Sequence, residues 1–376
     1  MSDLADELIA ATRSMLDRID IDTETPARGV SDALWAALIE AGFTSVDVPA
    51  EAGGHGCDTA DAIAVLSTVI GSGALVPFIE HAMLAAWLSG TTGQDVGRAT
   101  ATIGVAAAGY VVDDSVEPRR VTGVVRGVVH VSAASTLVIL LPETKNSGAR
   151  VATISLAHDS VSVTAGSDLL GASIGTVTLD SVPATTTADC PVTAADLRQR
   201  GALIYAAAMA AAAGTVRDRT VQYASERTQF GRPLTKFQAI QQRLASMAAS
   251  TTMMEIASRR AAAAASSAPR SARSATAAAK LVTSLYSHEV AAAGHQIHGA
   301  IGFTSEHPLG RSTTALWAWR DRYGTEREWA DVIASDILDA GSDPWDLMTG
   351  TAPPSGTAAT PNTEHVELSS TERIPQ

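Results

Sequence analysis

Two segments in the second half of the chain carry the residue types best suited to holding a ligand. The segment ERTQFGRPLTKFQAIQQ, residues 226–242, puts Arg227 beside a tight Gly-Pro turn between two predicted helices. A planar guanidinium there can make two parallel hydrogen bonds to a phosphate. The alternative is a capped interhelical loop with an ordinary surface arginine. The segment is therefore a candidate anion site that the turn must position.

The second segment, HQIHGAIGFTSEHPL, spans residues 295–309. Its glycines permit close approach of a ligand or of another backbone, and the amide of Gln296 can donate and accept hydrogen bonds at once. Three histidines and an acid are residue types that bind metal ions, but they lack the i, i+4 spacing of a helical zinc site, so no metal is expected. The histidines are interpreted as polar neighbours in packing. Two distant cysteines, Cys57 and Cys190, indicate neither a disulfide framework nor a zinc site.

The elements around these segments change character along the chain. Helical periodicity runs from Leu4 to about Gly90, with Leu34, Leu38 and Ile39 on one face and a break at Ala41-Gly42. From about residue 100 to 194 the chain has β-branched runs separated by turn residues, which predicts a β domain. Alanine-rich helices follow to about residue 338 and predict a bundle. The predicted strands cover residues 121–131, 137–141, 151–154 and 174–179.

We therefore expect an N-terminal helical domain (1–98), a middle β domain (99–195), a C-terminal helical bundle (196–345) and a disordered tail (346–376). Ile240, Leu244 and Met247 are predicted to form one buried stripe. The low-complexity stretch at 261–280 is predicted to be a surface connection, in which Pro269 ends a helix. The apolar windows 64–88 and 202–216 are predicted to be buried helices, because the first is interrupted by glycines, a proline and Glu80 and the second is too short to span a membrane.

The composition fits a compact protein with buried subunit contacts. Of 376 residues, 46% are hydrophobic and 18% charged, which favours a homo- or hetero-oligomer. A net charge of −13 opposes nonspecific binding to nucleic acid or to an anionic membrane. The first residues mix acids and bases at helical spacing and lack the apolar stretch of a signal peptide, so a cytoplasmic location is expected.

The two segments, about seventy residues apart, resemble motifs of the acyl-CoA dehydrogenase family, and VPAEAGGHG at 48–56 looks like that family's N-terminal loop. The resemblance extends from the first helices to about residue 338. It implies an α+β fold in which a helical N-terminal domain, a middle β domain and a C-terminal four-helix bundle enclose FAD and an acyl-CoA thioester.

The resemblance also implies which residues bind the cofactor. Arg227 and Phe230 match the family's FAD-contacting arginine and aromatic residue, and Gln238 matches a following glutamine. Gln296 and Gly299 match the second cofactor motif, in which Ala300 departs from the usual second glycine. In the family these groups reach the FAD of the neighbouring subunit, so the chain resembles a donor of half a site.

The chemistry of the family requires a carboxylate base, which removes an α-proton while the β-hydride goes to the flavin. Here the residue before the Gly-Thr pair is Tyr323, and the alternative position on the first bundle helix falls at or near Gly201, so the catalytic base is unknown. Three nearby acids could serve as a displaced base or form surface ion pairs. No segment matches the family's Thr-Glu-Pro and Trp-Ile-Thr flavin contacts. The three acids are Asp321, Glu326 and Glu328.

With these departures the chain resembles the base-lacking subunit of actinobacterial heterotetrameric acyl-CoA dehydrogenases. Those enzymes act in lipid metabolism on steroid or other bulky side chains. The implied function is FAD-dependent desaturation of an acyl-CoA with a homologous dehydrogenase subunit as partner and electron-transfer flavoprotein as acceptor. Two alternatives stay open: a self-sufficient homomeric dehydrogenase or oxidase with a displaced base, and a non-catalytic assembly subunit. The sequence does not name the acyl chain.

Overall fold

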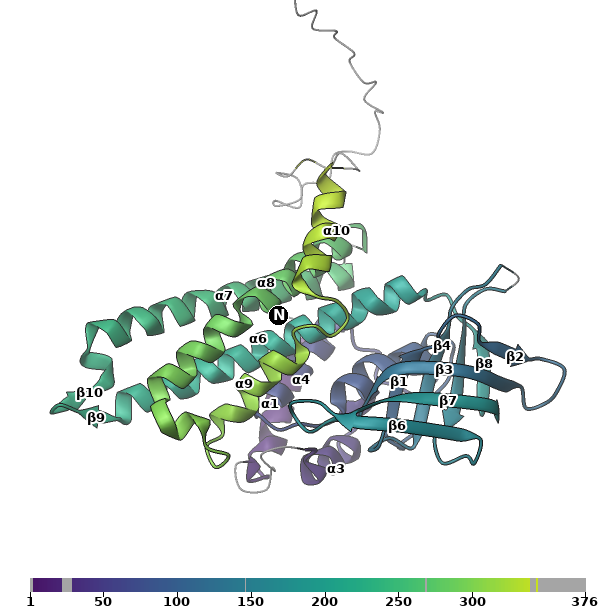
Figure 1. The fold of residues 1–376 in the computed structure, drawn as a ribbon, viewed down its shortest axis with the longest axis horizontal. Helices are drawn as coiled ribbons and strands as arrows, with labels where there is room; N and C mark the ends of the chain where they lie inside the picture. Colours follow the sequence, from purple (N-terminus) through teal and green to yellow (C-terminus); the bar gives the residue numbers. More distant parts are fainter. Residues whose placement is uncertain (1–2, 22–28, 146, 268, 339–342, 344–376) are drawn as a thin grey trace, which may run out of the picture.

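The computed structural model describes residues 3–21, 29–145, 147–267, 269–338 and 343. It confirms the expected α+β fold, in which helices are followed by two β-sheets and then by a helical bundle (Figure 1). The predicted tail at 346–376 lies outside the described residues. No helix among the described residues is long and apolar enough to cross a membrane.

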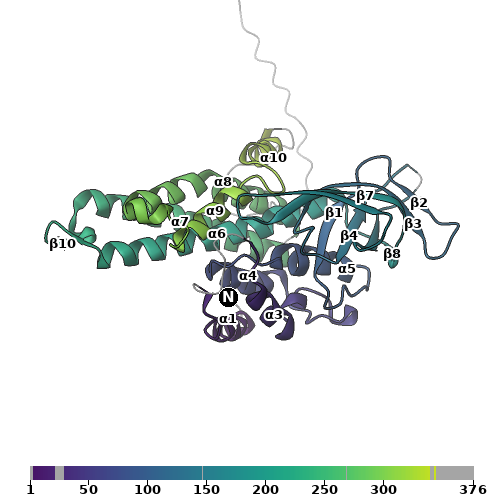
Figure 2. The same cartoon turned by 60° about the horizontal axis from the view of Figure 1, so that its bottom comes forward.

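The N-terminal helices lie beneath the bundle and the first sheet (Figure 2). Leu34 and Leu38 are fully buried as expected, Ile39 is half-buried, and their helix is followed by Gly42 in the left-handed conformation, with φ 78°. The π-helix η3 is buried at every position, including the acid Glu80. The elements are α1 (Asp3–Leu16), α3 (Asp32–Glu40), η1 (Phe43–Ser45), η2 (Ala50–Ala52), α4 (Thr59–Gly71), η3 (Ile79–Ala86) and α5 (Trp87–Gly90).

The β region contains two four-stranded sheets, ordered β1-β4-β5-β8 and β2-β3-β7-β6. The β-branched runs form strands where they were expected, because such side chains fit a pleated, half-buried surface. Strands β1, β2, β6 and β8 were not among the predicted strands; β6 lies at a sheet edge, and most of its residues are exposed. The strands are β1 (Ala101–Val105), β2 (Val111–Asp113), β3 (Arg120–Val129), β4 (Thr136–Leu141), β5 (Arg150–Ser155), β6 (Val161–Ser167), β7 (Ser173–Pro183) and β8 (Thr186–Asp189).

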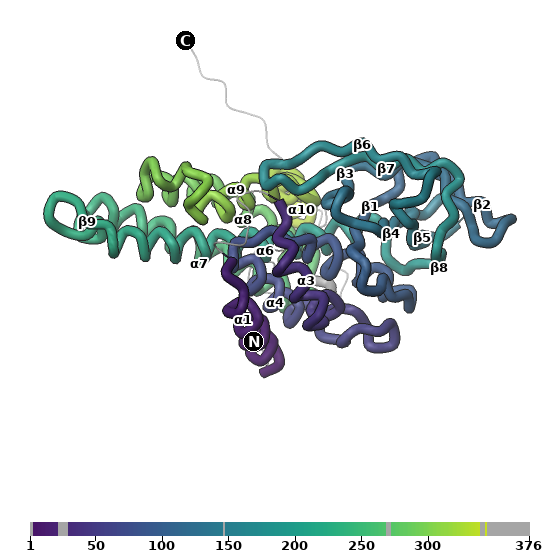
Figure 3. The backbone as a smooth tube through the Cα atoms, turned by 90° about the horizontal axis from the view of Figure 1, so that it is seen from below, coloured from purple at the N-terminus to yellow at the C-terminus, as the bar shows by residue number. Residues whose placement is uncertain are grey.

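The bundle begins with α6, a helix of 33 residues that starts with a capping box at Thr193 and Asp196. The window 202–216 lies in α6 and is almost entirely buried, as its composition predicted. The connection β9–β10 lies at the end of the bundle farthest from the β-sheets (Figure 3). The elements are α6 (Ala194–Glu226), β9 (Thr228–Gln229), β10 (Arg232–Pro233), η4 (Leu234–Lys236), α7 (Gln238–Ser267), α8 (Pro269–His298), η5 (Gly299–Phe303), α9 (Leu309–Trp319) and α10 (Glu326–Leu338).

The low-complexity stretch at 261–280 is not a surface connection. Helix α7 continues to Ser267, and α8 begins at Pro269, so almost the whole stretch is helical. Alanine has the highest helix propensity, and proline is well suited to a first helical position because it needs no amide donor there. Within the stretch, alanines at 261, 262, 272, 277 and 279 are buried. In the predicted stripe only Met247 is buried, while Ile240 and Leu244 are half-buried.

A buried ion pair ties the start of α6 to the N-terminal helices. The Arg200 guanidinium pairs with Asp47, donates to the Met83 carbonyl and stacks 4.1 Å from the Trp87 ring centroid. Burial raises the pKa of Asp47, and the guanidinium opposes that shift. Arg200 directly precedes Gly201. The ion pair therefore fixes the backbone at one of the two positions where the family resemblance places a catalytic carboxylate.

Candidate active site

The first motif forms a short hairpin at the free end of the bundle. Helix α6 ends at Glu226, Arg227 takes an extended conformation, and the Leu234 N–H donates to the Arg227 carbonyl at 2.9 Å. Phe230 and Gly231 form the turn with φ of 50° and 77°, the pattern of a type I′ turn. The Phe230 side chain is 92% exposed in an uncommon backbone conformation. A hairpin this short therefore presents an aromatic ring to its surroundings.

The neighbouring side chains form a small aromatic cluster. The ring centroids of Phe230 and Phe237 lie 6.2 Å apart, and the Arg232 guanidinium lies 4.3 Å from the Phe237 centroid. Arg227 and Gln238 are exposed, and Arg227 forms no ion pair with any residue in the described part of the chain. The cluster can therefore offer a guanidinium, an amide and a ring face to a ligand outside this chain.

The second motif lies where α8 ends and η5 begins. Gln296, Gly299 and Ala300 are exposed, and a β-carbon on Gly299, whose φ is 67°, would meet no atom within 4 Å. They border an open pocket of about 630 Å³ with aromatic walls at Phe303 and Trp317. Small residues form much of the pocket lining, so a planar group of a ligand can come close to the backbone there. The pocket is lined by His288, Ala291, Ala292, His295, Gln296, Gly299, Ala300, Phe303 and Trp317.

Tyr223 joins the two motifs. It lies one turn before Arg227, stacks on His298 with ring centroids 4.4 Å apart, and donates its hydroxyl to the His298 carbonyl at 3.3 Å. Gly299 follows that carbonyl directly. The predicted cofactor residues of both motifs therefore lie at one end of the bundle, and all five are exposed.

The histidines of the second motif are held by packing. His298 bonds the Gly294 carbonyl at 2.8 Å, His295 bonds the Thr313 hydroxyl at 2.9 Å, and the His307 ring accepts from the Leu309 amide at 3.2 Å. Burial lowers the pKa of His295 and of His298. Within the described ranges no group of three His, Cys, Asp or Glu side chains could hold a metal.

The two positions where the resemblance places a carboxylate are in contact. Tyr323 lies between α9 and α10 with φ of 54°, and its ring covers Gly201. A β-carbon at Gly201 would come 2.3 Å from Tyr323 Cδ1, so no side chain fits there without movement. Glycine offers no base, and burial raises the pKa of the phenol above its ordinary 10.0. Neither position can remove a proton at neutral pH.

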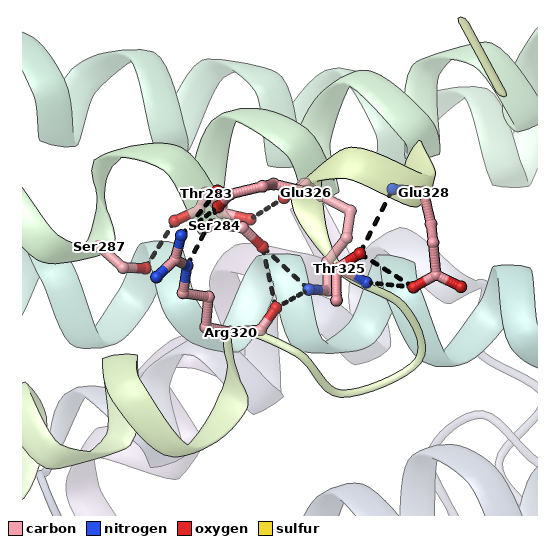
Figure 4. A network of polar contacts seen from close by, with 8 residues as sticks. Thr283, Ser284, Ser287, Arg320, Thr325, Glu326 and Glu328 are labelled. Carbon is pink, nitrogen blue, oxygen red and sulfur yellow. Dashed lines mark hydrogen bonds and ion pairs between the residues drawn. The ribbon is translucent and has the colours of Figure 1, made fainter. Parts of the chain in front are cut away.

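The nearby acids are engaged in stabilising the α9–α10 turn (Figure 4). Glu326 accepts hydrogen bonds from Nε and Nη2 of Arg320 at 2.6–3.0 Å. Glu328 accepts from the Thr325 amide at 2.8 Å and pairs with Arg198. The ion-pair interpretation therefore holds for these two acids. Asp321 is exposed.

A buried lysine fixes the same turn from beneath. Lys280 in α8 is fully buried, and its ammonium donates to the Ser284 hydroxyl at 2.9 Å and to the Arg320 carbonyl at the end of α9. Burial lowers the pKa of Lys280 to about 8. A cation at a helix C-terminus is favourable, so Lys280 anchors the turn that carries Tyr323.

Sequence reasoning missed a polar cluster beside Tyr323. The Tyr205 hydroxyl donates to the carboxylate of Glu80, and His130 Nε2 lies 3.8 Å from the other carboxylate oxygen. All three side chains are buried. The signal available was the acid that interrupts the apolar window 64–88, since an acid is rarely buried without a partner. Its partners come from other domains and could not be read from the sequence.

The three-part architecture is similar to the fold of solved acyl-CoA dehydrogenases. Residues 196–326 match the family model described as acyl-CoA dehydrogenase, C-terminal domain. The ChsE4-ChsE5 complex from Mycobacterium tuberculosis contains a chain with a TM-score of 0.78 and 23% identity, over 91% of this chain and 99% of that one. At this identity the likeness concerns the fold.

Sequence relatives point the same way. Acyl-CoA dehydrogenase FadE27 of Mycobacterium tuberculosis is 28% identical over 74% of this chain and 80% of its own length. Acyl-CoA dehydrogenase IpdE2 of the same species is 34% identical over 29% of this chain, and the match spans 32% of IpdE2. The C-terminal part of the chain thus matches the acyl-CoA dehydrogenase family model, and the chain is similar to acyl-CoA dehydrogenases in sequence and in fold.

Proposed function

We propose that this chain is the non-base subunit of a heteromeric, FAD-dependent acyl-CoA dehydrogenase. It lends residues at the free end of its bundle to FAD that a homologous subunit holds, and that subunit supplies the base. The observation that carries the proposal is the packing of Tyr323 on Gly201, because it leaves no carboxylate and no space at either position where one was sought.

The cofactor assignment rests on five exposed residues. Arg227 would bind the diphosphate of FAD, and Phe230 would cover an apolar part of the cofactor. The amides of Gln238 and Gln296 would donate hydrogen bonds to polar atoms of the cofactor, which would pass close to Gly299. The bound cofactor would supply the hydride acceptor that α,β-desaturation requires. All five residues are exposed, and the pocket that Gln296 and Gly299 border is open, so a second protein surface would complete the site.

The surface around the pocket supports a covering partner. Phe303 is 74% exposed, Ile301 46% and Trp317 41%, all near the exposed Gln296 and Gly299. Buried interface cores favour such aromatic residues. The proposed partner is a homologous dehydrogenase subunit in a heterotetramer, and one similar structure is a complex of two chains, ChsE4 and ChsE5. Acyl-CoA as substrate, electron-transfer flavoprotein as acceptor and a cytoplasmic place in lipid metabolism belong to the same proposal.

Flavin content separates this proposal from its alternatives. The chain is purified alone and together with a homologous dehydrogenase subunit. After gel filtration, the absorbance is recorded from roughly 350 to 500 nm, where flavins absorb. We expect flavin only in the complex. Flavin and turnover in the chain alone would favour a self-sufficient homomer, and a colourless complex would favour a non-catalytic assembly subunit.

A further inference from the structure

A cluster of polar side chains fills the place where the three parts of the fold meet. Glu80 comes from η3 in the N-terminal part, His130 follows β3 in the β region, and Tyr205 lies in α6 of the bundle. The Tyr205 hydroxyl donates to Glu80, and His130 Nε2 is 3.8 Å from the same carboxylate. The three side chains therefore join all three parts of the fold at one point.

Aromatic rings close the cluster on the side of the bundle. The Tyr205 ring lies 5.8 Å from the Tyr323 ring and 6.1 Å from the Trp319 ring, measured between centroids. Tyr205 is 1% exposed and Glu80 is 3% exposed. The Tyr323 ring in turn rests on Gly201. The tyrosine that binds the buried carboxylate is thus packed against two further aromatic side chains of the bundle.

An ion pair holds the turn next to Tyr323 against the β region. Arg322 donates to Asp168 at 3.0 Å, and each side chain is 13% exposed. Tyr205 lies between Glu80 and Tyr323, because its hydroxyl donates to Glu80 and its ring is next to the Tyr323 ring. A turn fixed on two sides, by this pair and by Lys280, gives the Tyr323 ring little freedom to leave.

We infer that the junction of the three parts is a ligand site occupied by this chain's own side chains, with the Tyr323 phenol in the place of a ligand. Removing that ring opens a site between Tyr205 and Gly201 for a small phenol. One consequence of this occupancy is that flavin is held only at the free end of the bundle, and that consequence rests on the proposed function. The occupancy of the junction by Tyr323 does not rest on the proposed function.

The test uses p-cresol, which reproduces the Tyr323 side chain. Tyr323→Gly is the variant of choice, because glycine suits the φ of 54° while removing the ring. Tyr323→Phe is the matched control, because it keeps the ring. We expect millimolar p-cresol to raise the melting temperature of Tyr323→Gly by several degrees and to leave the wild type and Tyr323→Phe unchanged, since a ligand stabilises only a state that binds it.

Equal stabilisation of all three proteins, or no stabilisation of a folded Tyr323→Gly protein, would overturn the inference. If Tyr323→Gly yields no folded protein, Gly201→Ala replaces it as the test, because its added methyl competes with the ring for the same space. A lower melting temperature is then expected, and an unchanged or higher one contradicts the inference. Flavin plays no part in either measurement, so the proposed function can fail while this result stands.

Discussion

The ring of Tyr323 lies on the backbone of Gly201, and a β-carbon at Gly201 would fall 2.3–2.5 Å from three atoms of that ring. Tyr323 keeps this position although its φ of 54° is unfavourable for a residue with a β-carbon. Strain of this kind persists only when the surrounding structure imposes it. Here Lys280, Arg322 and the Trp329 indole, which donates to the Tyr323 carbonyl at 3.1 Å, hold the turn.

The first prediction is that positions 201 and 323 are energetically coupled. Gly201→Ala should lower the free energy of unfolding by about 1–3 kcal/mol through overpacking, although alanine favours the helix by roughly 1 kcal/mol. In a Tyr323→Gly background the same change should be neutral or stabilising. Urea unfolding of the four proteins gives the coupling energy.

Gly310→Ala is the matched control for this cycle. Gly310 also lies in a helix, α9, but a β-carbon there would meet no atom within 4 Å. We expect this substitution not to destabilise the protein. Additive effects at positions 201 and 323 would show that the ring does not occupy the space above Gly201.

The second prediction concerns the exposed arginine of the first motif. Arg227→Ala should weaken FAD retention in the complex by about 1.5–3 kcal/mol, because a charge-assisted phosphate contact is lost. Arg227→Lys should recover only part of the loss, since an ammonium cannot bond in two parallel directions. The measurement is the flavin released on serial dilution of the complex.

Arg126→Ala provides the control for the change in net charge. Arg126 is exposed on β3, remote from the bundle end. Its loss should leave flavin retention unchanged. If Arg227→Ala and Arg126→Ala retain flavin equally, Arg227 does not contact the cofactor.

The sequence predicted the fold and the motifs better than the junction. β-Branched runs and alanine-rich helices depend on local periodicity, which a sequence shows directly. A tight turn after Arg227 was likewise expected, but the type I′ conformation at Phe230 and Gly231 was not, because a positive φ is uncommon for phenylalanine. The contact of Tyr323 with Gly201 depends on how helices pack, and the partners of Glu80 come from two other domains. Such contacts require the tertiary structure.

The third prediction is a loss of stability in acid caused by His81. This side chain is 1% exposed, and its Nδ1 accepts the Ala101 amide at 2.9 Å, which requires an unprotonated nitrogen. Burial lowers its pKa from 6.5 to about 4. Between these values the unfolded chain binds a proton that folded His81 does not, so stability present above pH 6.5 is lost as the pH falls towards 4.

The expected loss is about 2–3 kcal/mol on going from neutral pH to about pH 4.5, measured by urea unfolding. His81→Asn keeps an acceptor for the Ala101 amide and removes the titration, so its stability should fall less over this range. His55→Asn, at an exposed position, should behave as the wild type. A His81→Asn profile parallel to that of the wild type would rule out this assignment.

The last prediction concerns the missing base. General-base catalysis contributes typically 10²–10⁴-fold, so the isolated chain should dehydrogenate acyl-CoA thioesters very slowly even with excess FAD. Activity, followed with an artificial electron acceptor, is expected only when a homologous subunit is added.

Restoring a carboxylate by Tyr323→Glu should not rescue turnover. The new side chain would replace a ring packed on Gly201 and would lie near the buried carboxylate of Glu80, so desolvation and like charge would both raise its pKa. The folded variant would then lose stability as the pH rises through that raised pKa, whereas Tyr323→Gln should show no such dependence. Efficient turnover by the isolated wild-type chain would refute the base-less interpretation. In that case Glu80→Gln is the first substitution to test, because Glu80 lies in the junction beside Tyr323 while Glu326 is bound by Arg320.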